Sequence, residues 1–191
     1  MKKNPKKKQI VEAAARIIAE KGYESASIKE IATEAGLTAP GLIHYYFKSK
    51  EEILREVMRE SRERYEEEFE NPSLRPSSDL FGSEEYQAHV TERRDPDWYK
   101  LRYELFAQGL RDPALSHDVY QLLEVGREGI ADVLDSTLIH LSEEERESLS
   151  AILLACFDGL ALQKLLRPEL DLEKTYALLE TMIVDRFSPS K

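Results

Sequence analysis

The chain has 191 residues, 41% of them apolar and 34% charged, with a formal net charge of −10. This composition is that of a folded globular protein and excludes an intrinsically disordered chain. No run approaches the roughly 20 continuous apolar residues of a membrane span, and no apolar signal-peptide core follows the lysine-rich start. The single cysteine cannot form an intramolecular disulfide. We therefore expect a cytoplasmic protein with no membrane partner.

The charge is unevenly distributed along the chain. Residues 1–50 contain ten Lys or Arg against five Asp or Glu, which gives +5, whereas residues 51–191 carry −15. A basic segment on an acidic remainder indicates that only the first segment contacts a polyanion, while the remainder repels it. On charge alone, a lysine-rich tail that only improves solubility is the alternative.

The first fifty residues have the periodicity of three helices joined by tight turns. A first helix is expected from about Lys6 to Lys21, ended by Gly22 as a left-handed C-cap. A capping box, Ser27 to Glu30, opens a short second helix that ends at Ala35-Gly36. Thr38 is expected to cap a third helix that ends near Phe47.

Later helix starts are marked by capping residues or by Asp-Pro pairs. A capping box at Ser49 to Glu52 predicts a long helix to about Glu70, and a weak helix is predicted at 83–93. No strand is predicted, so the fold class is all-α with about nine helices. The remaining starts are Asp95-Pro96, Asp112-Pro113 (a helix to about His140), Ser142 to Glu145, and Asp171.

The second and third of these helices have the form of a helix-turn-helix. Such a unit places one short helix in the major groove, which is about 12 Å wide, while the other braces it. The groove helix needs small or hydrogen-bonding residues on its exposed N-terminal face, and lysines near a helix N-terminus favour a phosphate. The candidate DNA-binding residues are Ser27, Thr38, Ala39, Pro40, Gly41, His44, Tyr45, Lys48 and Lys50. Tyr46 and Phe47 are expected to pack, and Ser27 is expected to act mainly as an N-cap.

Residues 8–54 resemble the DNA-binding domain of the TetR family of repressors. The resemblance is carried by Ile10 to Tyr23, Ser27 to Gly36, Gly41 to Phe47 and Lys48 to Leu54. It implies an all-helical homodimer that binds double-stranded operator DNA and responds to a small-molecule effector. It also implies a helix-turn-helix domain at 1–50 and a ligand-binding and dimerisation domain at 51–191. Near Ala39-Pro40 this sequence is one residue longer than the commonest family spacing, so the resemblance does not assign individual base contacts.

The C-terminal segment resembles a TetR subgroup that includes the BetI-type regulators, through the stretch Phe157 to Gln163 and the following Arg167 to Leu170. The family architecture implies that the last two helices, about 143–166 and 172–187, pair with their twofold mates. Packing of the same surface within the monomer is the alternative. The candidate dimer-interface residues are Leu153, Phe157, Leu160, Leu179, Met182 and Ile183.

A ligand cavity is expected among the helices between Ser83 and about Phe157. Aromatic side chains with a few polar groups suit a small, mostly apolar effector, although each of these residues also fits a core position. The candidate ligand-binding residues are Trp98, Arg102, Tyr103, Phe106, Tyr120, Leu123 and Phe157.

An enzyme is disfavoured because the sequence has neither a phosphate-binding glycine loop nor a histidine pair at metal-ligand spacing. We therefore expect no catalytic residues, no metal site and no cofactor. The more serious alternative keeps the fold but lacks the effector: a DNA-binding protein that acts through a protein partner. A filled core in the C-terminal domain would favour that alternative, and a large apolar cavity would favour the ligand-controlled repressor.

Overall fold

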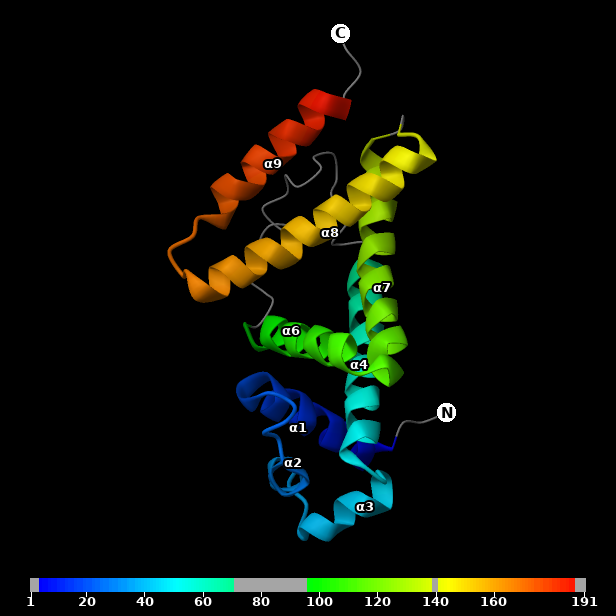
Figure 1. Cartoon of the computed structure of the whole chain (residues 1–191), viewed down its shortest axis with the longest axis vertical. Coiled ribbons are helices and arrows are strands. Elements are labelled where there is room, and N and C mark those ends of the chain that lie inside the picture. Colours follow the sequence, from blue (N-terminus) through cyan, green and yellow to red (C-terminus); the bar gives the residue numbers. More distant parts are fainter. Residues whose placement is uncertain (1–3, 71–95, 139–140, 188–191) are drawn as a thin grey trace. The chain divides into compact units, whose positions relative to one another are not determined.

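The computed structural model describes residues 4–70, 96–138 and 141–187, and within them the chain is all-α, as predicted. These ranges contain eight α-helices and one 3-10 turn (Figure 1). The predicted weak helix at 83–93 lies outside the described residues. The helices are α1 (Pro5–Lys21), α2 (Ile28–Glu34), α3 (Ile43–Tyr46), α4 (Lys50–Glu70), α6 (Pro96–Arg111), α7 (Pro113–Thr137), α8 (Glu143–Leu166) and α9 (Leu172–Phe187), and the 3-10 turn η1 is Pro40–Leu42.

Side-chain caps set several helix starts where the sequence predicts them. Ser27 and Ser142 each form a complete capping box, in which the serine accepts a backbone N–H and the glutamate three residues later reaches back to it. Asp112 accepts the N–H of Ala114 at 2.9 Å, and Asp171 accepts the N–H of Lys174 at 3.1 Å. These starts depend on residues two or three positions apart, which is why the sequence was sufficient to find them.

Three local predictions need correction. Gly22 has the expected positive φ of 79°, but its ψ of 158° is extended, so it is not a left-handed helical cap. Ser49 accepts the N–H of Glu52, whereas the Glu52 carboxylate accepts the N–H of Lys48 at 2.7 Å and leaves the box incomplete. The helix predicted to reach about His140 ends at Thr137.

The described residues form two packing units, of which the first contains residues 4–64 and 96–122. In this unit α1 packs against α6 on one side and α2 on the other (Figure 1). The domain boundary predicted at residue 50 stays a prediction. Packing divides the chain differently: it groups the first part of α4, all of α6 and the start of α7 with the N-terminal helices. The side chains buried most completely in this core include Ile10, Ile18, Ile31, Ile43, Phe47, Ile53 and Leu54.

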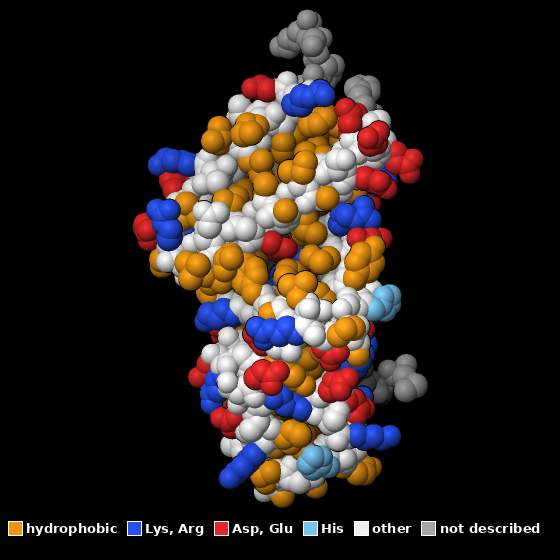
Figure 2. Space-filling view, viewed as in Figure 1, with side chains coloured by type: hydrophobic (Ala, Val, Ile, Leu, Met, Phe, Trp, Pro, Cys, Tyr) orange, Lys and Arg blue, Asp and Glu red, His pale blue; other side chains and the backbone are white. Residues whose placement is uncertain are grey.

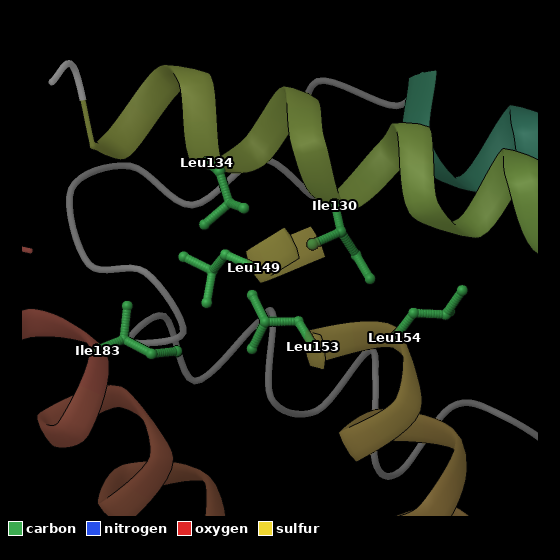
Figure 3. Packing of buried hydrophobic residues seen from close by; sticks show 6 residues of the cluster. All are labelled: Ile130, Leu134, Leu149, Leu153, Leu154 and Ile183. Carbon is green, nitrogen blue, oxygen red and sulfur yellow. The ribbon is translucent and has the colours of Figure 1, made fainter. Parts of the chain in front are cut away.

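The second unit contains the described residues 65–70, 123–138 and 141–187. Leucine and isoleucine side chains from α7, α8 and α9 meet in one cluster (Figure 3). Its buried members are Ile130, Leu134, Leu149, Leu153, Leu154 and Ile183.

α8 is the one helix in the described ranges whose length and apolar composition would suffice to cross a membrane. Its Leu149, Leu153 and Leu154 instead lie in the buried cluster of the second unit. Helices in the cores of soluble proteins commonly meet the same criterion, so this finding is weak support for a membrane span.

Candidate nucleic-acid interface

The helix-turn-helix lies between α2 and α3. Gly36 has a φ of 63°, a conformation that glycine adopts without steric cost, and the N–H of Leu37 donates to the carbonyl of Ala32 at 3.0 Å. The chain turns sharply here within a few residues, which lets a second short helix follow directly.

The groove helix begins at Pro40 and not at the predicted cap, Thr38. Ala39 is extended, with φ −140° and ψ 131°, and makes no side-chain cap. Steric contact with a following proline disfavours the helical region, and the proline ring itself suits the first helical position. The element is therefore shorter than predicted: the 3-10 turn η1 followed by the single turn of α3.

Two buried side chains hold this short element in place. Ile43 is fully buried and Phe47 is 2% exposed, as expected for anchors of a small domain. Tyr46 is half-buried, and its ring meets that of Tyr45 edge to face, with 5.1 Å between the centroids. The inward side chains thus fix which face of the element is left to solvent.

The opposite face carries most of the predicted DNA-binding residues, and all of those on it are exposed. Tyr45 is the most prominent, with 83% of its surface accessible. Leu42, at 46% exposed, extends this face and was not among the predicted contacts. The exposed predicted residues are Thr38, Ala39, Pro40, Gly41, His44 and Tyr45.

The other predicted contacts differ in how freely they can meet a phosphate. Lys48 is exposed. Lys50 is half-buried: its ammonium lies 3.2 Å from the carbonyl oxygen of Glu24 and 4.3 Å from the centre of the Tyr23 ring. Ser27 is exposed, but its hydroxyl donates to the Glu30 carboxylate at 2.8 Å while accepting the Glu30 N–H. Its capping role is confirmed.

Ion pairs engage two further cations of the basic segment. Arg16 lies 2.9 Å from Glu34, and Lys21 lies 2.7 Å from Glu30. The hydrogen bond from Lys21, with those from Ser27, lowers the pKa of Glu30 to about 2.

The predicted DNA contacts omit Lys7, whose ammonium lies 4.9 Å from the centre of the Phe47 ring. The lysine run at the start of α1 was the available signal.

The predicted ligand-binding residues divide between the two packing units. On α6, Trp98 and Arg102 are buried, and the Arg102 guanidinium lies 4.7 Å from the centre of the Phe106 ring. Tyr103, on the same helix, is half-buried and stacks on Tyr99, whereas Tyr120 on α7 is 55% exposed. Leu123 and Phe157 are half-buried in the second unit, where Phe157 contacts Tyr176. Their shared role in ligand binding stays a prediction.

Most of the predicted dimer-interface side chains already pack within the monomer. Leu153 is 1% exposed and Ile183 is 5% exposed, so neither has much surface left for a partner. Phe157, Leu160 and Leu179 are half-buried, and Met182 is 61% exposed. In Figure 2, hydrophobic side chains gather along α8 and α9. The large exposed ones on these two helices are Ile152, Leu162, Leu166, Leu178, Met182 and Val184.

A short exposed helix, held by buried anchors and braced by a second helix across a glycine turn, defines a DNA-binding protein of the helix-turn-helix class. Two family models match the chain: bacterial regulatory proteins of the tetR family at residues 10–57, and the tetracyclin repressor-like C-terminal domain at residues 84–185. The chain belongs to the tetR family, whose members are DNA-binding transcription regulators and not enzymes.

The chain is also similar to individual regulators in sequence, and it shares its fold with a solved structure. The fatty acid metabolism regulator protein of Bacillus subtilis (strain 168) is 43% identical over 68 residues, 36% of this chain and 34% of that protein. The match thus spans about a third of that relative's length. The HTH-type transcriptional regulator PksA of the same organism is 28% identical over 171 residues, 85% of this chain and 80% of that protein. The structure of Salmonella enterica GusR has a TM-score of 0.75 at 21% identity, covering 99% of this chain and 98% of that one.

Proposed function

We propose that this chain is a repressor that binds a pseudo-palindromic operator as a homodimer and is released by a small-molecule effector. The observation that carries the proposal is the solvent-facing side of η1 and α3, which buried Ile43 and Phe47 hold in place. It leaves the small residues Ala39 to Gly41 and the ring of Tyr45 free for a groove. Release by a ligand is typical of the family.

Two kinds of DNA contact follow from the chemistry of this face. His44, Tyr45 and Thr38 carry hydrogen-bonding groups that reach base edges or phosphates, and the side chains of Ala39 and Pro40 suit a thymine methyl. Lys48 and Lys50 lie at the start of α4, where their charge and the helix N-terminus favour a phosphate. Ser27 is a secondary contact because its hydroxyl already caps α2.

The exposed apolar side chains of α8 and α9 support the homodimer. Six large hydrophobic residues are at least 38% exposed on two adjacent helices, which is more than scattered surface residues account for. A twofold axis through this surface would bury them against the same surface of a second copy. Two groove helices would then read half-sites about 34–36 Å apart, or a multiple of this.

The effector is proposed to be a small and mostly apolar molecule. Support comes from Trp98, Tyr103 and Phe106 on α6, and from the name of one relative, which regulates fatty acid metabolism.

The proposal also assigns the chain to the subgroup that includes the BetI-type regulators, on the resemblance of residues 157–170. It places the protein in the cytoplasm, because operator DNA is there. A role as regulator only, without catalysis, is proposed because the chain belongs to a family of transcription regulators.

The proposal is tested by selecting duplexes from a random-sequence pool with the full-length chain and measuring affinity by retardation at several salt concentrations. The selected duplex should contain two related half-sites and bind at least about 10³-fold more tightly than random duplex. Equal affinity for selected and random duplexes would exclude operator recognition.

A further inference from the structure

The turn between α1 and α2, residues 22–26, is held by a side chain from far along the sequence. The carboxylate of Glu104 in α6 accepts the backbone N–H of Tyr23 at 2.9 Å. The same oxygen accepts the side-chain amide of Gln108 at 2.9 Å, and Gln108 is only 4% exposed. A buried amide therefore orients the carboxylate toward the turn.

The Glu104 carboxylate also lies against the backbone of the turn at Gly22. A Cβ on Gly22 would lie 3.7 Å from both Glu104 carboxylate oxygens, so the carboxylate rests directly against the chain where α1 ends. A carboxylate is electrostatically disfavoured at a helix C-terminus, where the helix dipole is negative. Its hydrogen bond to the partly buried Tyr23 N–H is charge-assisted, and removing it would leave that N–H poorly satisfied.

The other side of the same turn contacts a residue proposed to bind DNA. The Lys50 ammonium lies 4.3 Å from the centre of the Tyr23 ring and 3.2 Å from the carbonyl oxygen of Glu24. Both contacts restrict a long side chain that would otherwise lose conformational freedom on binding a phosphate. The backbone of Tyr23 is thus fixed by Glu104, and its ring helps to place Lys50.

We propose that Glu104 is a positioning residue for DNA binding: it fixes the α1–α2 turn so that Tyr23 and Glu24 hold Lys50 in place at the start of α4. The inference rests on the proposed contact between Lys50 and the DNA backbone. It assigns to α6, whose side chains are also candidate ligand contacts, a defined effect on one cation of the DNA-binding segment.

The test measures the affinity of the full-length chain for its selected duplex. Glu104→Ala should weaken binding about fivefold, and Glu104→Gln, which keeps a hydrogen-bonding oxygen, should restore it to within about twofold. Asp97→Ala is the matched control, because it removes the same charge from the same helix at an exposed pair with Lys100. Simple electrostatics predicts equal or tighter binding for both alanine variants, since each removes a negative charge.

A double-mutant cycle then separates positioning from general destabilisation. Lys50→Ala should weaken binding and reduce the salt slope by about one. Adding Glu104→Ala to it should lower the affinity little further, because both changes remove the same contribution, that of Lys50. Tyr23→Leu should behave like Glu104→Ala and provides the same cycle if Glu104→Ala does not fold. Additive losses, or a Glu104→Ala affinity equal to that of Asp97→Ala, would overturn the inference while leaving the Lys50 contact intact. Unchanged affinity and slope in Lys50→Ala would refute that contact, and with it the positioning role.

Discussion

The guanidinium of Arg55 in α4 donates to the carboxylate of Asp118 in α7 at 2.9 Å, and to the carbonyl oxygen of Ala114 at 3.0 Å. The Arg55 and Asp118 side chains are about one-third to two-fifths exposed, so solvent weakens their attraction. We expect Asp118→Asn to lower the free energy of unfolding by about 1 kcal/mol or less, measured by urea denaturation. Lys100→Ala, which removes an exposed pair within one helix, should have a smaller effect. A larger loss in the control would contradict this ranking.

Glu30 provides a pH-dependent contribution to stability. Hydrogen bonds from the Lys21 ammonium and from Ser27 lower its pKa from 4.5 to about 2. Because the folded pKa lies below the unfolded one, the stabilisation is complete above pH 4.5 and is lost as the pH falls toward 2. Carboxyl NMR titration measures this pKa directly.

Two comparisons test the cause of this shift. Glu145 forms the same kind of capping box with Ser142, but no lysine hydrogen bond contributes to its lowered pKa, so it should titrate at a higher pH than Glu30. The stability difference between the wild type and Glu30→Gln should shrink below pH 4.5. A difference that stays constant down to pH 2 would show that the charge of Glu30 does not stabilise the fold.

Lys48 is expected to contact phosphate without reading sequence. Lys48→Ala should weaken binding to selected and random duplexes by a similar factor and reduce the salt slope by about one. Lys174→Ala, an exposed lysine on α9, serves as the control and should leave both quantities unchanged. Loss of affinity for the selected duplex alone would instead assign Lys48 to a base contact.

Tyr45 is expected to contribute to recognition with little effect on folding, because 83% of its surface is exposed. Tyr45→Ala should weaken binding to the selected duplex by about tenfold and change the melting temperature little. Tyr46→Ala should lower the melting temperature, since Tyr46 is half-buried. Retardation and thermal melting distinguish the two, and a Tyr45→Ala variant with unchanged affinity would remove this residue from the interface.

Leu178 tests the proposed dimer surface. It is 62% exposed on α9, so a charge there is tolerated by the monomer but disfavoured in an apolar interface. Leu178→Glu should shift the chain toward monomer in sedimentation velocity experiments. Leu110→Glu changes a leucine that is 89% exposed on α6 and should leave the assembly as it is. If both variants sediment like the wild type, α9 does not form the interface.

The sequence was sufficient for the all-α class, most helix boundaries and the helix-turn-helix. The Ser27 and Ser142 capping boxes, the glycine turn at Gly36 and the family motif all depend on residues close together in the chain. The error at Thr38 arose because Pro40 competes for the same helix start, and the restriction that a proline places on the preceding residue is stronger than the preference for a threonine cap.

Tertiary structure alone decided which face of each helix is covered. Periodicity placed Leu153, Ile183 and Met182 on apolar faces, but only packing in the second unit showed that the first two are buried and the third is exposed. Likewise Lys50 and Glu104 are ordinary charged residues until the fold brings them to the same turn, where Tyr23 meets both. Local interactions determine where helices begin and end, whereas burial and long-range contacts depend on neighbours that the local sequence does not contain.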